Sequence, residues 1–221
     1  MDYRRFEIDG DGLVVTFDMC SSTRMVEELT LCGALHRYDD LVTSIKEHLA
    51  AAQSKVLFDP YKFHGDGWIL LFPANVDGGL VFKCLQDLCR FYESAAERLV
   101  LRYLPARPQV SGLTFGIEKG PLRAMRIYGQ REYVGRALNV ACRLQSAIKD
   151  NDKSPAYKAL VSNAAFNEYF SSVAKLVKVW KVKRTLRNIR EGSEFWCRKV
   201  EFLNVQPNVA VARAAPRAPS H

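Results

Sequence analysis

The chain has 221 residues, of which 48% are hydrophobic and 25% are charged, so it is long and apolar enough to bury one substantial core. No apolar run approaches ~20 residues, which excludes a helix that crosses a membrane, and the start "MDYRRFEIDGDG" lacks the apolar stretch of a secretory signal. The net charge of +8 indicates an anionic partner but does not choose among nucleotide, nucleic acid and lipid.

The first half of the chain predicts one strand, two helices, a hairpin and a further long helix. The run "GLVVTFD" is almost entirely apolar and ends at Asp18, which is typical of a core strand, and helical spacing of apolar residues follows it. The predicted elements are a strand at 12–18, a helix that starts at the cap candidates Ser21, Ser22 and Thr23, a helix at 35–52, a hairpin at 55–72 and a helix at 77–103.

The second half predicts shorter elements and a tail. The predicted elements are two strands within 109–129 that meet at a Lys119-Gly120 turn, a helix at 135–149, the strand "KALVS", a short helix around 163–170, and strands near 173–183 and 194–202. This β-α-β-β-α-β order with C-terminal α/β additions predicts an α+β, ferredoxin-like fold with helices on one face of a sheet. We expect one domain at 1–203 and a disordered Pro/Ala-rich tail at 204–221.

The six cysteines form no C-x-x-C pair, and no histidine stands at metal-ligand spacing from them. We therefore expect reduced thiols in a cytoplasmic protein, and we do not expect zinc. These cysteines are Cys20, Cys32, Cys84, Cys89, Cys142 and Cys197.

The stretch "YKFHGDGWILLF" places Asp66 at the tip of the predicted hairpin. Asp-Gly is a favoured hairpin turn, so Asp66 alone indicates only turn chemistry. The predicted topology brings it beside Asp18, and two carboxylates at neighbouring strand ends repel each other unless a cation such as Mg²⁺ or Mn²⁺ lies between them. The helix that opens at "MCSST" offers free backbone N–H groups that could hold a phosphate next to that cation.

The stretch "VGRALNVACRLQSAIK" places two polar residues on an otherwise small and apolar helix. Asn139 and Arg143 are four residues apart and therefore share one helical face, and Gly135 permits close backbone approach at the start of the helix. Asn or Arg alone on a helix is most often a solvated surface residue. The pair therefore indicates a functional site only in combination with the two aspartates.

Four stretches resemble, in their order and spacing, the catalytic domain of class III nucleotidyl cyclases. They are "VVTFDMCSST", "YKFHGDGWILLF", "TFGIEKGPL" and "EYVGRALNVACRL", and the similarity covers about residues 12–200. The resemblance implies a head-to-tail homodimer with active sites at the interface, each built from both chains. It also implies that the ribose 3′-OH of a nucleoside triphosphate attacks its α-phosphate, with two Mg²⁺ or Mn²⁺ ions per site and pyrophosphate as the leaving group.

Position by position, the resemblance assigns metal binding to Asp18 and Asp66, with help from the backbone carbonyl of Met19. It assigns Asn139 to orientation of the ribose and Arg143 to the pentavalent phosphate. Arg143 would stabilise the negative charge that grows in the transition state.

The resemblance also assigns residues to the base and to the triphosphate of the substrate. Lys62 matches the base-reading lysine of adenylate cyclases, whereas Glu132 stands where those enzymes have Asp or Thr. Lys183 is the best match for the triphosphate-binding lysine, with Lys181 and Arg184 as competitors.

The residues leave more than one nucleobase open for the substrate. Lys62 donates and an ionised Glu132 accepts, and this pair could serve any of the four bases. Glu is one methylene longer than Asp and the segment between Gly120 and Gly135 is short, which favours a one-ring base. The chain also resembles the stand-alone pyrimidine cyclases of Pycsar antiphage systems, whose cyclic UMP or cyclic CMP activates a separate effector. We expect UTP ahead of CTP, with ATP as the alternative substrate.

Two other functions compete with catalysis. A cyclase-like regulator that only binds nucleotide is disfavoured because Asp18, Asp66, Asn139 and Arg143 are all present. A nucleic-acid-binding module is suggested by the basic residues between 175 and 190, but that run lacks regularly interleaved aromatic residues. We therefore expect no nucleic-acid partner and no membrane insertion.

Overall fold

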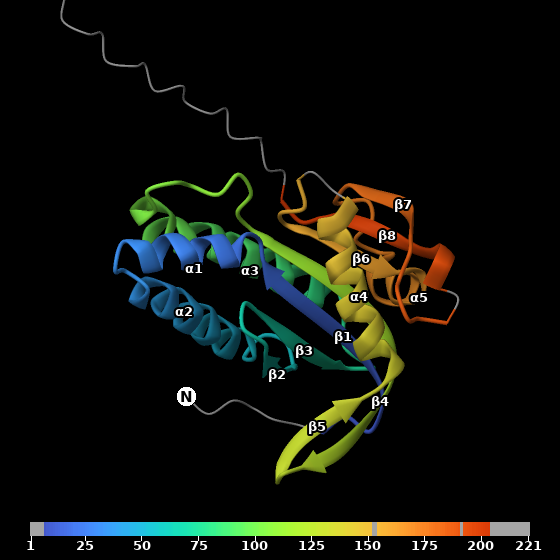
Figure 1. Cartoon of the computed structure of the whole chain (residues 1–221). Helices are drawn as coiled ribbons and strands as arrows, with labels where there is room; N and C mark the ends of the chain where they lie inside the picture. The colour runs from blue at the N-terminus through green and yellow to red at the C-terminus, as the bar shows by residue number, and fades with distance from the viewer. Residues whose placement is uncertain (1–6, 152–153, 191, 204–221) are drawn as a thin grey trace, which may run out of the picture.

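Seven strands form one continuous sheet, and an eighth strand extends it as an arm (Figure 1). The computed structural model describes residues 7–151, 154–190 and 192–203. The sheet order is β2-β3-β1-β4-β6-β8-β7, with β5 paired to β4. The strands are β1 (Gly10–Met19), β2 (Asp59–Phe63), β3 (Gly67–Pro73), β4 (Leu113–Ile127), β5 (Gln130–Val134), β6 (Lys158–Ser162), β7 (Val179–Arg184) and β8 (Phe195–Glu201).

The helices are close to those predicted, and the α+β class is confirmed. They are α1 (Ser22–Leu31), α2 (His36–Ala52), α3 (Gly78–Leu99), α4 (Arg136–Asn151) and the short α5 (Asn163–Ala165), with single turns at Leu101–Tyr103, Phe166–Phe170 and Gly192–Glu194. None of the helices in the described ranges is both long and apolar enough to cross a lipid bilayer. The tail predicted at 204–221 lies outside the described residues.

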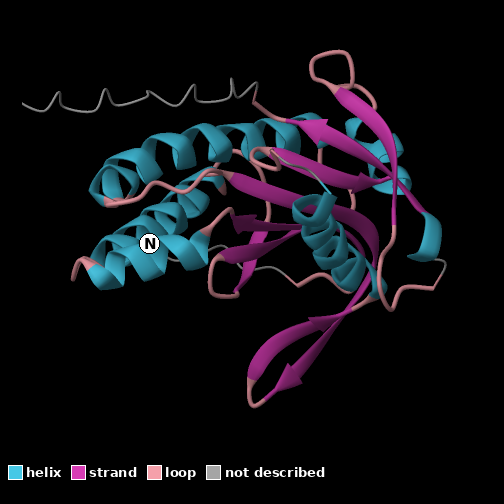
Figure 2. Ribbon diagram, turned by 45° about the horizontal axis from the view of Figure 1, so that its top comes forward, coloured by secondary structure: helices cyan, strands magenta, loops and turns pink. Residues whose placement is uncertain are grey.

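Helices cover both faces of the sheet, so the prediction of one covered face is wrong. Leu13, Val15 and Phe17 of β1 pack with α1, α2 and α3, whereas Val14 packs with Ala137 and other residues of α4 on the opposite face (Figure 2). The reason is visible in β1 and β3, which are buried along nearly their whole length. A strand that is apolar on both sides needs cover on both sides.

Helix α4 lies unusually close to the sheet. A Cβ at Gly116 of β4 would stand 1.9 Å from the carbonyl oxygen of Ala141, and one at Gly135 would stand 2.4 Å from that of Pro121. Both positions therefore require glycine, and the close approach expected at Gly135 is confirmed.

The β4–β5 hairpin differs from the prediction. The chain does not turn at Lys119-Gly120, because β4 continues to Ile127 and reverses at Tyr128-Gly129, where both residues have positive φ angles of 49° and 76°. This two-residue turn suits the right-handed twist of its strands. The resulting arm, from Arg123 to Val134, projects from the body of the protein (Figure 1).

Candidate active site

Asp18 and Asp66 lie side by side where β1 ends and β3 begins. Asp18 is paired in register with Gly67, and the backbone N–H of Met19 donates a hydrogen bond of 3.0 Å to the carbonyl oxygen of Asp66. A Cβ at Gly67 would stand 2.0 Å from the carbonyl oxygen of Phe17, so only glycine allows the turn to approach β1 this closely. The hairpin thus carries one carboxylate to the other, as the sequence predicted.

Neutral side chains from three helices surround the two carboxylates. The hydroxyl of Ser22 donates to Oδ2 of Asp66, and Nε2 of Gln145 donates to Oδ2 of Asp18 at 3.3 Å and to the Thr114 hydroxyl at 2.9 Å. Burial, and then the charges of both aspartates, raise the pKa of Tyr38, which keeps that phenol neutral. Sequence reasoning missed Gln145 and Tyr38; the only signal for Gln145 is a polar residue on the apolar side of α4.

The donor set fits a hard divalent cation. Mg²⁺ is usually held by one or two carboxylates together with water and substrate phosphates, and the two aspartates supply that number of carboxylates. Over the described ranges, no group of three or more His, Cys, Asp or Glu side chains is placed to hold a metal, so a fully protein-enclosed site of that kind is not formed there. Asp18 and Asp66, with the adjacent carbonyl of Met19, are therefore the residues that would hold such an ion.

The start of α1 lies next to Asp66. Ser21 has a left-handed backbone with φ of 58°, its hydroxyl donates to the Val110 carbonyl oxygen at 2.8 Å, and it does not cap the helix. Thr23 is exposed. The side chain of Ser21 therefore does not cap the backbone N–H groups in the first turn of α1. This turn lies beside the carboxylates of Asp18 and Asp66.

Lys62 and Glu132 form a second cluster, which joins β2 to the arm. Nζ of Lys62 lies 2.9 Å and 2.8 Å from the two carboxylate oxygens of Glu132, and the Tyr61 hydroxyl also donates to Glu132. The Tyr61 hydroxyl in turn accepts the backbone N–H of Tyr133 at 3.1 Å. The hydrogen bonds from Lys62 and Tyr61 lower the pKa of Glu132, so this carboxylate is ionised at neutral pH and acts only as an acceptor.

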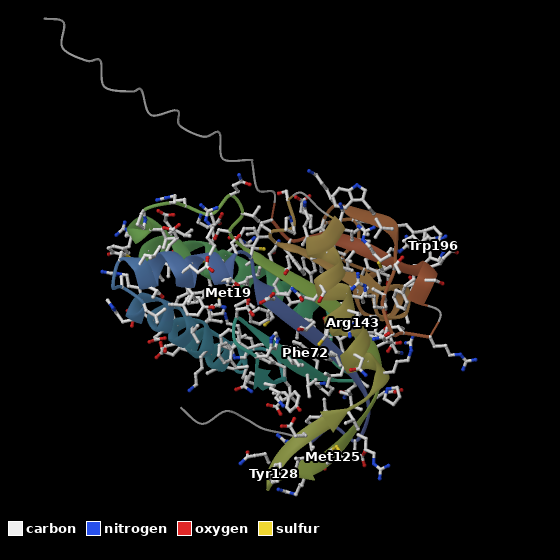
Figure 3. All side chains as sticks on the ribbon, viewed as in Figure 1. Met19, Phe72, Met125, Tyr128, Arg143 and Trp196 are labelled. Carbon is white, nitrogen blue, oxygen red and sulfur yellow. The ribbon has the colours of Figure 1, made fainter. Side chains whose placement is uncertain are left out.

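Asn139 and Arg143 lie on the solvent side of α4. Both side chains are exposed, and neither makes a hydrogen bond or an ion pair with another residue in the described part of the chain. Figure 3 shows Arg143 on α4, away from the arm. Within one chain, no such bond joins them to Asp18 or Asp66.

The triphosphate candidates on β7 face opposite sides of the sheet. Nζ of Lys183 forms an ion pair of 2.5 Å with Glu194 and lies 5.4 Å from the centre of the Trp196 ring. Side chains alternate along a strand, so Arg184 lies on the same face as Val182, which packs with α4. Arg184, rather than Lys183, is therefore the candidate on the α4 side.

Comparisons with known proteins give fold similarity at low identity. No protein-family model matches the chain, and no curated protein matches it. The adenylyl cyclase CyaB from P. aeruginosa superposes with a TM-score of 0.65 at 14% identity, over 89% of this chain and 95% of that one. The guanylyl cyclase Cya2 gives 0.66 at 15%, over 87% and 94%, and an adenylate cyclase from Trypanosoma brucei gives 0.61 at 15%, over 90% and 93%. The chain thus has the fold of class III adenylyl and guanylyl cyclase catalytic domains.

Proposed function

We propose that the chain is a nucleotidyl cyclase, which converts a nucleoside triphosphate into its 3′,5′-cyclic monophosphate and pyrophosphate. The observation that carries this proposal is the placement of Asp18 and Asp66 at adjacent strand ends, beside the start of α1, on a cyclase fold. Two divalent ions held there would lower the pKa of the ribose 3′-OH and neutralise the leaving pyrophosphate.

The protein's own groups position the triphosphate and stabilise its charge. The first-turn N–H groups of α1 would bind phosphate oxygens next to Asp66. Asn139 would orient the ribose, and Arg143 would stabilise charge on the phosphorus under attack, an effect of about 3–4 kcal/mol for one well-placed donor. Arg184 would bind the distal phosphates. We assign no side chain as general base, so positioning and electrostatics carry the reaction.

A head-to-tail homodimer would complete the site. The side chains of Asn139 and Arg143 are exposed and make no hydrogen bond or ion pair in the described ranges, as expected for residues that complete the site of a second copy. The arm supports this arrangement, because Met125, Ile127 and Val134 share one face of it with Glu132 and are exposed. An isolated two-stranded hairpin is only marginally stable in water, so packing of these three apolar side chains on a second copy would stabilise the arm.

Geometry at Glu132 supports a pyrimidine substrate, with UTP ahead of CTP. Lys62 and Glu132 are within one hydrogen-bond length of each other, which matches the adjacent donor and acceptor on the edge of a single base. The Tyr61 hydroxyl donates to Glu132, whose side chain is one methylene longer than that of Asp and would therefore extend further into the base pocket. That reach favours one ring over two. ATP is the alternative substrate, and the solved neighbours include adenylyl and guanylyl cyclases.

The cellular role that we propose is production of a second messenger for antiviral defence, in which the cyclic nucleotide reaches a separate effector. It follows from the resemblance to Pycsar cyclases together with the pyrimidine proposal. A regulator that binds nucleotide without turnover is the other candidate.

The deciding experiment is incubation of the purified protein and Mn²⁺ with each of the four ribonucleoside triphosphates, with products identified by mass. We expect cyclic UMP as the main product, with a preference that can reach about 10⁴-fold where a buried polar group would be left unpaired. Cyclic AMP as the dominant product would overturn the pyrimidine proposal and keep the cyclase proposal. Nucleotide binding without any cyclic product would leave only the regulator.

Substitution Glu132→Asp tests the size argument. Shortening this side chain by one methylene should raise turnover of ATP relative to UTP by roughly ten-fold, because a methylene in a pocket is worth about that ratio. Glu194→Asp, the same change at a residue on the far side of the sheet, is the control and should leave the ratio unchanged. An unchanged ratio in Glu132→Asp would show that reach does not select the base.

Substitution Gln145→Ala tests the positioning of Asp18. The Gln145 amide holds Oδ2 of Asp18, and loss of such a partner typically costs 10- to 100-fold in metal affinity or activity, so we expect a loss of about that size. The expected signature is a raised Mn²⁺ concentration for half-maximal rate. The neighbouring exposed Ser146→Ala is the control. A rate that falls at every Mn²⁺ concentration, with no change in metal dependence, would argue against this role.

A further inference from the structure

Most of the net charge of the chain lies in one short segment. Residues 175–201, through the end of β8, contain nine Lys or Arg and three Glu, against a net charge of +8 for all 221 residues. The segment includes β7, which is the last strand of the sheet, and its partner β8 (Figure 1). This end of the sheet is therefore a strongly positive edge, and charge of this density attracts polyanions.

Aromatic rings are interleaved with these cations. Nζ of Lys181 and of Lys183 lie 4.8 Å and 5.4 Å from the centre of the Trp196 ring, and Nζ of Lys199 lies 4.9 Å from that of Trp180. Both rings are exposed, Trp180 by 40% and Trp196 by 46%. The rings come from two strands that pair in space, so the sequence of the basic run alone could not show the interleaving.

The two tryptophans face opposite sides of the β7–β8 ribbon. Lys183 pairs with Trp196 and Trp180 pairs with Lys199, and residues that pair across strands share a face. Trp180 and Lys183 are three residues apart on one strand, so they point to opposite faces. A flat membrane could contact only one of these faces at a time, whereas a flexible chain can wrap around the edge and contact both.

From this arrangement we infer that the β7–β8 edge binds single-stranded nucleic acid. The lysines and arginines neutralise phosphates, and the exposed indole faces stack on bases, which is how sequence-independent binders of single strands work. The Lys183–Glu194 ion pair removes part of the charge but leaves the other cations of the segment. The expectation of no nucleic-acid partner rested in part on the lack of interleaved aromatic residues in the basic run, whereas the paired strands place two tryptophans beside these cations. Lys181 and Lys183 lie on the face of β7 opposite Arg184, the residue proposed for the triphosphate, and β4, β6 and β8 lie between β7 and the strand that carries Asp18.

The test is fluorescence anisotropy of labelled 15-nucleotide single strands, one RNA and one DNA of the same mixed sequence, with the full-length protein and no metal or nucleotide. We expect saturable binding that weakens with salt. Trp196→Ala should weaken it by roughly ten-fold, since one stacked base contributes about that much. Lys181→Gln with Lys183→Gln should reduce the slope of log affinity against log salt by about 1.4, because each single-strand phosphate contact contributes about 0.7.

Two variants serve as controls. Arg143→Ala removes a cation outside the β7–β8 edge and should keep full affinity even though it is expected to abolish cyclase activity. Trp196→Phe retains a ring and should keep most of the affinity, which separates stacking from a folding defect. A stronger response to RNA or to DNA identifies the natural strand.

Several outcomes would overturn the inference. One is absence of binding at low salt, and another is equal affinity of Trp196→Ala and wild type. A third is weak binding to both strands together with tight binding to vesicles of anionic phospholipid, which would make the edge a membrane contact.

Discussion

Substitution of either aspartate of the proposed metal site, Asp66→Ala or Asp18→Ala, is expected to reduce cyclic nucleotide formation by several orders of magnitude. Both carboxylates would hold the ions that activate the 3′-OH and neutralise the pyrophosphate, so removal of one weakens both effects at once. The fold should survive, because the turn is held by backbone contacts such as the Met19–Asp66 hydrogen bond rather than by the carboxylate. Product measured by mass, with circular dichroism and size-exclusion chromatography, checks both statements.

Two controls sharpen that experiment. Asp66→Asn keeps the shape and the contact with Ser22 but loses the charge, so it should be nearly as inactive as the alanine variant. Asp40→Ala, at an exposed position of α2, should be fully active. If Asp66→Ala formed product at a near-normal rate, the assignment of metal binding to this pair would be wrong.

Mixing two inactive variants is expected to restore activity. In a head-to-tail dimer, Asp66 of one chain and Arg143 of the other belong to the same site. A heterodimer of Asp66→Ala and Arg143→Ala chains therefore has one site with both defects and one intact site. With equal amounts and free exchange, about one quarter of wild-type activity should return, because half of the dimers are heterodimers with one working site each.

The matched control for this experiment is a mixture of Asp18→Ala and Asp66→Ala chains. Both defects then fall on the same side of every site, so each site of the heterodimer lacks one aspartate and no activity should return. Exchange of subunits can be verified with differently tagged chains. If exchange occurs and the Asp66→Ala and Arg143→Ala mixture stays inactive, a site within one chain becomes the better model.

Local patterns predicted most of the fold. The apolar run that ends at Asp18 and the Gly-Asp-Gly turn gave the correct strands, and the pairing of Asp18 with Gly67 brings the two acids together as expected. The prediction of a turn at Lys119-Gly120 was wrong because a glycine can also occur inside a strand. Residues of β4 on both sides of Gly120 pair with β1 and β5, so the strand continues through this position. The packing of helices on both faces of the sheet was not predicted, because the periodicity of a helix does not indicate on which face of the sheet it packs.

The candidate site was harder to predict where it depends on distant contacts. The hydrogen bond between Gln145 and Asp18 joins residues far apart in the sequence, and no local motif predicts it. Whether Lys183 or Arg184 points to the α4 side of the sheet depends on the alternation of side chains along β7. The sequence of a basic run does not show which of its residues point to that side. The aromatic and basic edge is formed by two strands, so it became visible only with their pairing.

The close contact at Gly116 has a consequence for how the proposed enzyme would move. The α4 backbone packs directly on β4, and Gln145 of α4 donates a hydrogen bond to Asp18. The aspartate pair and the α4 residues Asn139 and Arg143 of one chain therefore form a single rigid unit. A local shift of α4 alone would then not enclose the substrate, and in the proposed dimer rotation of one whole subunit against the other would close the site. In a two-fold dimer that rotation changes both interfacial sites together, so binding at the first site would alter the affinity of the second.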